Sequence, residues 1–248
     1  MFHRSLAPLR VGQPVRLLWL ALGSVALAEI ASLAQPDAVV LDLQHGLWER
    51  GTLEAAIGIV NARVSVIVRT ADDSLAAIAS ALDAGAAGVL VPLVETAEDA
   101  RRIVQAGRYP PVGRRSAGGV RPLLHGIAGM RLADQNLALG ALIETVQGVE
   151  NASEICAVAG LNFVFIGTGD LSISLGDGDA AALAACCARV RDAAHSHGLP
   201  CGLFTMDADA AREALANGYD MVVVANDIAL TRNGFVQAMQ TSRTPAAA

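Results

Sequence analysis

Short runs of apolar residues recur along the whole chain, and Ala-rich stretches separate them. Most of these runs are continuous rather than alternating, which is typical of strands that are buried on both faces. Eight runs are present, at residues 16–22, 38–43, 64–70, 88–94, 141–146, 163–169, 200–206 and 221–227. The pattern therefore predicts eight buried strands with helices between them.

Several of the Ala-rich stretches end in glycine, the residue that most often follows the end of a helix: Gly85, Gly107, Gly198 and Gly218. Eight strand–helix units in a chain of 248 residues predict a single-domain α/β fold, a (β/α)8 TIM barrel. We expect the barrel to span residues 1–240 and residues 241–248 to form a disordered C-terminal tail. A doubly wound open sheet is the competing fold, and the lack of a GxGxxG motif after the first strand counts against it.

Two segments depart from this repeat. Residues 107–140 are rich in Gly, Pro and Arg, and we expect them to form a long loop over one mouth of the barrel. The basic, then apolar N-terminal segment resembles a secretory signal, but it also fits a first strand at 16–22 and a helix from about Ser24. We favour the strand and helix, and the apolar run is too short to span a membrane.

Composition narrows the class of partner. The net charge is -6, the pI is near 5.3 and no basic stripe is visible, so we expect no nucleic-acid partner. The four cysteines are Cys156, Cys186, Cys187 and Cys201, and they form neither a CxxC zinc motif nor a disulfide framework. We interpret them as buried free thiols and expect a cytoplasmic protein.

Polar residues gather where the predicted strands end, and the C-terminal ends of the strands carry the chemistry in (β/α)8 barrels. These residues are Asp42, Gln44, His45, Arg69, Glu95, Glu144, Asp170 and Asp227. Glu144 and Asp170 follow neighbouring strands, so their carboxylates can converge. Two carboxylates without His or Cys partners favour a hard cation such as Mg²⁺ or Mn²⁺.

Each of these residues also has a structural interpretation. Glu144 could pair with Arg69 without any metal, and Asp170 could cap the following helix. His45 and Asp42 could act as hydrogen-bonding groups in the fold. We assign a structural role to Glu95 and Asp227.

Several longer motifs together resemble one family over nearly the whole chain. They are "LDLQHG", "VIVRT", "VLVPLVETAEDAR", "GRYPPVGRRSAGG", "LIETVQGVEN" and "FIGTGDLSISLG". The sequence is similar to the HpcH/HpaI family of metal-dependent (class II) pyruvate aldolases. This resemblance implies that Glu144 and Asp170 hold the divalent metal, which would be Mg²⁺, Mn²⁺ or Co²⁺.

The resemblance also implies roles for the other residues of these motifs. His45 and Asp42 would form a catalytic dyad, and Arg69 would contact the keto oxygen of bound pyruvate. The backbone amides of Gly169 and Asp170 would hold the pyruvate carboxylate.

Gln44 departs from the family pattern, which has Glu before the His. We expect Gln44 to hydrogen-bond a metal-bound water or a neighbouring loop, since an amide cannot carry a negative charge. Thr70 stands where Pro is common, and Gly169 replaces a frequent Ala.

The resemblance implies cleavage or formation of 4-hydroxy-2-oxo acids, with pyruvate and an aldehyde as the small-molecule partners. The chain contains no Lys, which excludes a Schiff-base aldolase. The resemblance further implies a homo-oligomer, a hexamer built as a trimer of dimers that exchange C-terminal helices.

Two alternatives remain open on the sequence. A CoA-thioester lyase of the same superfamily would need a basic patch near the mouth, for which Arg114, Arg115 and Arg121 are candidates. The second alternative is a barrel that has lost catalysis and binds a small 2-oxo acid. It is motivated by Gln44, which stands where the family pattern has Glu. The buried charges expected at the mouth argue against this second alternative, because a barrel freed of catalysis has no stability reason to keep them.

Overall fold

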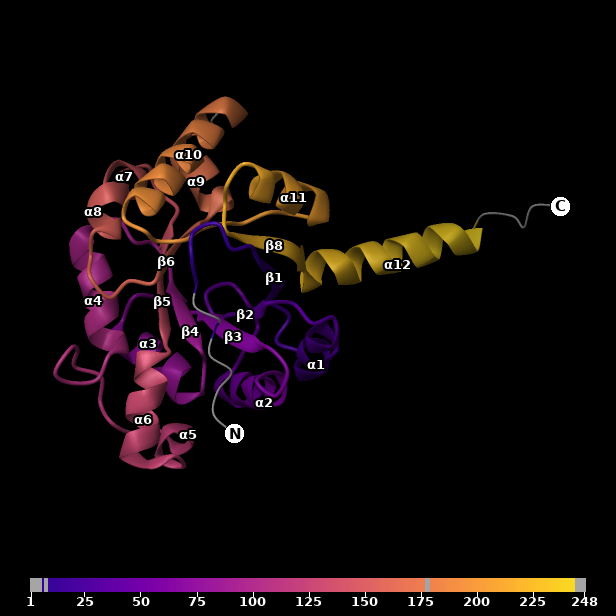
Figure 1. The fold of residues 1–248 in the computed structure, drawn as a ribbon. Coiled ribbons are helices and arrows are strands. Elements are labelled where there is room, and N and C mark those ends of the chain that lie inside the picture. Colours follow the sequence, from indigo (N-terminus) through magenta and orange to yellow (C-terminus); the bar gives the residue numbers. More distant parts are fainter. Residues whose placement is uncertain (1–5, 7–8, 177–178, 244–248) are drawn as a thin grey trace.

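The computed structural model describes residue 6 and residues 9–176 and 179–243. Eight parallel strands close into a barrel in chain order, so that the first strand pairs with the last (Figure 1). The strands are β1 Val15–Leu20, β2 Ala38–Asp42, β3 Ser65–Arg69, β4 Gly88–Val91, β5 Ala138–Ile143, β6 Phe163–Ile166, β7 Cys201–Leu203 and β8 Met221–Asn226. The predicted (β/α)8 barrel is confirmed.

Helices surround most of the barrel, and hydroxyl or carboxylate side chains begin several of them. Ser24, for example, accepts a hydrogen bond from the backbone N–H of Leu27 and caps the first helix. The helices are α1 Val25–Leu33, α2 Arg50–Val60, α3 Leu75–Asp83, α4 Ala97–Gly107, α5 Val120–Leu123, α6 Gly126–Gln135, α7 Val146–Glu150, α8 Ala152–Cys156, α9 Thr168–Ser174, α10 Ala180–Ser196, α11 Ala208–Ala216 and α12 Asp227–Arg243.

Successive strand residues point to opposite faces of the sheet, and this alternation divides the interior into two cores. One core fills the barrel and includes Trp19, Val40 and Phe165. The other lies between the barrel and its helices and includes Val39 and Leu41. Residues that share the alternation of the first set therefore face the inside of the barrel.

Residues 107–140 differ from the expected long loop. They contain α5 and α6, and β5 begins at Ala138 rather than at 141. Gly140 lies inside β5, and only glycine fits there because the ring of Phe163 occupies the space that a Cβ would need. The expectation failed because it rested on the Gly, Pro and Arg content of the segment, which does not report how the segment packs.

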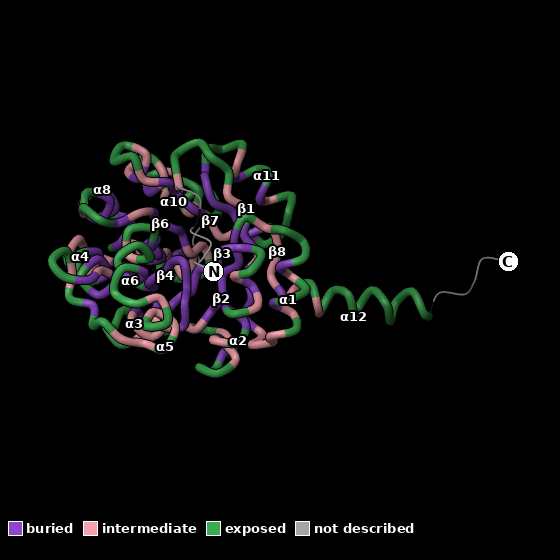
Figure 2. Tube along the Cα trace, turned by 60° about the horizontal axis from the view of Figure 1, so that its bottom comes forward, coloured by how far each residue is buried: buried purple, intermediate pink, exposed green. Residues whose placement is uncertain are grey.

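The last helix, α12, extends away from the barrel instead of covering it (Figures 1 and 2). Its one buried residue among those described is Asp227. The helix continues to Arg243, so the first residues of the expected C-terminal tail are helical, and residues 244–248 lie outside the described part. None of the helices described is long and apolar enough to cross a membrane.

Candidate active site

The inner face of the barrel continues into polar residues at the C-terminal ends of three strands. Asp42 follows Val40 by two positions, Arg69 follows Ile67, and Glu144 follows Leu142. Since Val40, Ile67 and Leu142 all belong to the inner core, the period of two residues aims the three polar side chains into the mouth.

Asp42 and Arg69 form a buried ion pair across neighbouring strands, where they are register partners. The Nε of Arg69 donates to Oδ1 of Asp42 at 2.8 Å, and its Nη2 donates to Oδ2 at 2.5 Å. The side chain of Arg69 is 10% exposed and that of Asp42 is 3% exposed. Burial would raise the pKa of Asp42, but the hydrogen bonds and charge of Arg69 outweigh burial and hold that pKa below its ordinary value.

Trp19 completes this cluster and was not among the residues identified from the sequence. Its indole N–H donates to Oδ2 of Asp42 at 3.2 Å, and the guanidinium of Arg69 lies 5.1 Å from its ring centroid. Trp19 shares the inward alternation of Leu17 near the end of β1. The alternation of β1 predicts that Trp19 points inward, but Trp19 was not identified because its side chain does not ionise.

His45 and Gln44 lie in the loop after β2. The backbone N–H groups of both residues donate to Oδ1 of Asp42, at 3.3 and 3.0 Å respectively. The imidazole of His45 is exposed and forms no hydrogen bond with the residues that the structure describes. The dyad of His45 with Asp42 therefore stays a prediction. Oε1 of Gln44 is buried and has no partner among the described residues.

Glu144 follows β5 directly and is 1% exposed. Its Oε1 accepts a hydrogen bond from the backbone N–H of Leu93 at 2.9 Å, whereas its Oε2 has no partner in the described part of the chain. A Cβ on Gly167 would lie 2.5 Å from Oε2, so glycine there leaves room for the carboxylate. Neither Leu93 nor Gly167 was identified from the sequence, since both act through the backbone.

The surroundings of Glu144 disfavour its charged form. Burial raises the pKa of Glu144 to about 7, and the nearby carboxylate of Asp170 adds to the rise. The Leu93 N–H and the charge of Arg69 oppose this rise without cancelling it. A buried carboxylate beside a second carboxylate is the arrangement that a cation between them would stabilise.

Asp170 lies in the first turn of α9, and Gly167 occupies the capping position, so Asp170 is not the helix cap. The first hydrogen bond of this helix runs from the N–H of Leu171 to the carbonyl of Gly167. The N–H groups of Gly169 and Asp170 precede that bond and have no carbonyl within the helix to bind. They are therefore available to an anionic group of a substrate.

These residues fit a magnesium-type cation better than a zinc-type one. The described residues contain no cluster of three or more His, Cys, Asp or Glu side chains suited to a metal. Mg²⁺ is commonly bound through one or two carboxylates, and water or substrate oxygens supply the remaining ligands. Glu144 has a buried, unpartnered oxygen and lies near enough to Asp170 for that carboxylate to raise its pKa, which suits such a site. No ion pair joins Glu144 to Arg69 among the described residues.

Asp227 and Glu95 have structural contacts. Both oxygens of Asp227 accept hydrogen bonds from the backbone N–H groups of Ala21 and Leu22, each at 2.9 Å. This buried carboxylate fastens the end of β1 to the start of α12. The backbone carbonyl of Glu95 accepts a hydrogen bond from the side chain of Asn151.

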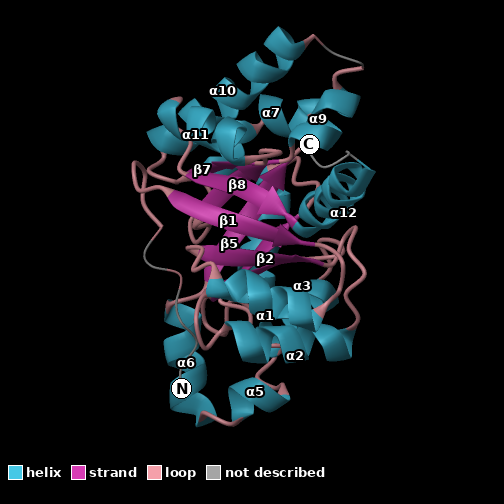
Figure 3. Cartoon of the chain, turned by 90° about the vertical axis from the view of Figure 1, so that its right-hand side faces the viewer, coloured by secondary structure: helices cyan, strands magenta, loops and turns pink. Residues whose placement is uncertain are grey.

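The basic residues that a CoA ligand would need lie elsewhere. Arg115 pairs with Asp83 at 2.8 Å, at the end of the helix that leads into β4, and Arg121 donates to the carbonyl of Glu54. Arg114, through its backbone N–H, bonds to Gln105. These three candidates for a basic patch therefore lie away from the C-terminal mouth, because their segment is on the side of the barrel where the strands begin (Figure 3).

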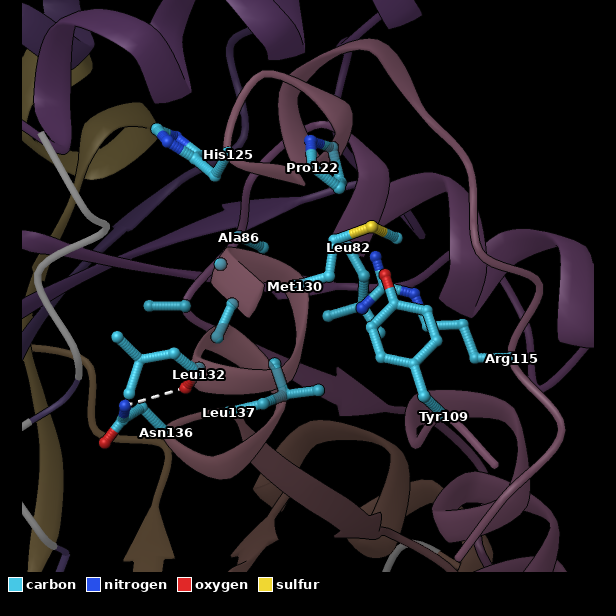
Figure 4. A pocket seen from close by; sticks show the side chains of 13 residues that line it. Leu82, Ala86, Tyr109, Arg115, Pro122, His125, Met130, Leu132, Asn136 and Leu137 are labelled. Atoms are coloured by element: carbon cyan, nitrogen blue, oxygen red, sulfur yellow. Dashed lines mark hydrogen bonds between the residues drawn. The ribbon is translucent and has the colours of Figure 1, made fainter. Parts of the chain in front are cut away.

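The same region contains a cavity of about 90 Å³. It lies between α3, α5 and α6, and apolar side chains such as Leu82, Met130 and Leu137 form most of its wall (Figure 4). The guanidinium of Arg115 stacks on Tyr109 at one end of it. None of the residues at the C-terminal mouth lines this cavity.

The fold and the polar residues at its C-terminal mouth define a (β/α)8-barrel enzyme. The chain belongs to the HpcH/HpaI aldolase/citrate lyase family, whose model matches residues 16–234. It is thus an aldolase, a carbon–carbon lyase of the class II pyruvate type, as the sequence motifs indicated.

Individual relatives cover most of the chain. A hydroxypyruvate/pyruvate aldolase of Rhizorhabdus wittichii is 35% identical over 226 residues, which are 88% of this chain and 90% of that protein. A 2-keto-3-deoxy-L-rhamnonate aldolase of Salmonella dublin is 34% identical over 234 residues, 90% of this chain and 86% of that one. The crystal structure of a family member from Burkholderia cenocepacia superposes with a TM-score of 0.88 at 30% identity and covers 94% of this chain and 96% of that one.

Proposed function

We propose that the protein is a divalent-metal-dependent aldolase that cleaves or forms 4-hydroxy-2-oxo acids, with pyruvate and an aldehyde as the other reactants. The observation that carries this proposal is the buried, unpartnered oxygen of Glu144 beside Asp170. The names of the relatives support a 2-oxo acid of the pyruvate type as one substrate. We further propose a cytoplasmic enzyme.

Glu144 and Asp170 would hold Mg²⁺ or Mn²⁺. When bound, the cation supplies Lewis-acid stabilisation of negative charge on the keto oxygen of the substrate. The N–H groups of Gly169 and Asp170 bind the substrate carboxylate. Arg69 donates to the keto oxygen, and Asp42 fixes the plane of the guanidinium through two hydrogen bonds.

His45 is the proposed base. Cleavage between C3 and C4 requires a group that removes the proton of the C4 hydroxyl, and an exposed imidazole at the mouth can reach a substrate. The same imidazole returns the proton when the reaction runs toward synthesis. Gln44, whose side-chain oxygen lacks a partner among the described residues, is proposed to hydrogen-bond a water at this site.

We also propose that the enzyme is a homo-oligomer, a hexamer arranged as a trimer of dimers. The support in this chain is α12, which carries exposed apolar residues and extends away from its own barrel (Figure 2). A second copy of the chain would cover this helix, as the family resemblance implies.

Metal removal and two substitutions test the proposed function. Glu144→Ala and Asp170→Ala should each abolish Mn²⁺ binding in calorimetry and pyruvate release from a 4-hydroxy-2-oxo acid. Circular dichroism should show that both variants stay folded. Activity of the unmodified protein should disappear with EDTA and return with added Mg²⁺ or Mn²⁺. Full activity after EDTA treatment and dialysis would contradict the proposal.

A further inference from the structure

Leu93 has an unusual backbone for its residue type. Its φ is +55°, in the left-handed region that favours glycine. Gln35 is the other non-glycine residue with a positive φ in the described part of the chain. Leu93 is 55% exposed, so burial of the residue does not offset the conformational cost. A strained residue beside a functional site points to a role for its backbone.

The strained conformation delivers one contact. In this conformation the N–H of Leu93 donates to Oε1 of Glu144 at 2.9 Å. The next residue, Val94, binds to β5, because its N–H donates to the carbonyl of Leu142 at 3.1 Å. The tight turn after β4 is therefore anchored at two points in and next to β5, at the carbonyl of Leu142 and at the carboxylate of Glu144.

The other oxygen of Glu144 is constrained from a different strand. Gly167, after β6, lies so close that a Cβ would sit 2.5 Å from Oε2 and 2.9 Å from the Cβ of Glu144. The carboxylate is thus bounded by Gly167 on one side and held by Leu93 on the other. This leaves Oε2 as the oxygen that is buried and without a partner in the described chain.

We propose that Leu93 is a positioning residue for the metal site: its left-handed backbone holds Oε1 of Glu144 and thereby presents Oε2 to the cation. This inference rests on the proposed function, because it assumes that Glu144 is a ligand. It assigns the role to the backbone of residue 93 and not to its side chain. Glycine should then replace leucine without loss, and a β-branched residue should not.

Mn²⁺ titration of the metal-free protein by calorimetry tests this prediction. Leu93→Gly should bind Mn²⁺ with the wild-type affinity, because glycine adopts a positive φ without strain. Leu93→Val should bind about 10–100-fold more weakly, the usual effect of losing a partner of a metal ligand. Gln35→Val is the matched control, since it places valine at the same φ of +55° at an exposed position before β2. It should keep the wild-type affinity.

Wild-type affinity in Leu93→Val would overturn the inference, and so would an equal loss in Leu93→Gly, which would assign the role to the side chain. A wild-type protein that binds no Mn²⁺ would overturn the proposed function together with the inference. If Leu93→Val does not fold, amide exchange decides. The Leu93 N–H should be protected in the wild-type protein and exchange freely in Glu144→Ala, and equal exchange in both would contradict the proposal.

Discussion

Two neighbouring residues of the mouth, Asp42 and His45, should respond to substitution in opposite ways. Asp42 is buried and satisfies Arg69, so Asp42→Ala leaves a buried guanidinium without its partner. We expect a loss of about 3–5 kcal/mol in the free energy of unfolding. His45 is exposed, and His45→Ala should change stability by less than about 0.5 kcal/mol.

The activities should separate the same pair of variants. His45→Ala should lower kcat by about 10²–10⁴-fold, the usual contribution of a general base. Urea unfolding and steady-state kinetics measure the two effects on the same preparations. Near-normal aldol cleavage by His45→Ala would show that His45 is not the base.

Glu144 should make the stability of the metal-free protein depend on pH. Its pKa rises from 4.5 to about 7 on folding, so between these values the folded protein retains a proton that the unfolded chain has released. Raising the pH through this window therefore lowers the free energy of unfolding, by up to about 3 kcal/mol at roughly 1.4 kcal/mol per unit. Thermal unfolding in EDTA from pH 5 to 8 measures the effect.

Glu144→Gln is the control for that measurement, because its amide does not titrate. The variant should lose most of the decline in stability between pH 5 and 7. The pKa of Asp42 lies below its ordinary value, so the stability that Asp42 contributes is lost only under more acidic conditions. An unchanged pH profile in Glu144→Gln would assign the decline to other groups.

The identities of the polar residues at the mouth could be predicted from the sequence, but their partners could not. Asp42, Arg69 and Glu144 each end an apolar run, which is a local signal. Asp42 contacts Arg69 because strands β2 and β3 pair in a particular register, and neither segment alone predicts that register. The contact of Leu93 with Glu144 likewise depends on a positive φ, which a leucine in the sequence does not predict.

At the scale of elements, strand existence was predictable and strand limits were less so. The apolar runs identified all eight strands, since continuous apolar character reports burial on both faces. The start of β5 was missed because residues 107–140 were assigned to a loop on their Gly, Pro and Arg content, although Gly140 lies in β5 and admits the ring of Phe163. The glycine at position 140 thus records the packing of a large side chain from the neighbouring strand β6.

Gly202 in β7 tests that interpretation, because the ring of Phe165 occupies the space of its missing Cβ. Gly202→Ala should lower the free energy of unfolding by about 1–3 kcal/mol, the usual cost of overpacking a core. Gly51 in α2 has no atom near its own missing Cβ, so Gly51→Ala should be neutral or stabilising. Urea unfolding of the two variants provides the comparison, and equal effects would contradict the packing argument.

At the scale of the whole molecule, α12 is the feature that the single chain does not explain. A barrel helix normally buries an apolar stripe against the strands, but α12 leaves large apolar side chains exposed. They are Ile228, Leu230, Phe235, Val236 and Met239. Asp227 holds the start of the helix on the end of β1, so the direction of α12 follows from a defined anchor.

If a second copy covers α12, a charge on its apolar side chains should dissociate the assembly. Phe235 is 69% exposed in the single chain, so Phe235→Glu costs the barrel almost no contacts but would place a charge in an apolar interface. Light scattering should show a smaller particle for this variant, with an unchanged circular dichroism spectrum. Gln237→Glu is the matched control, because it adds the same charge at an exposed polar position of α12 and should preserve the assembly. A wild-type protein that is already monomeric, or a Phe235→Glu variant of undiminished mass, would show that α12 does not mediate assembly.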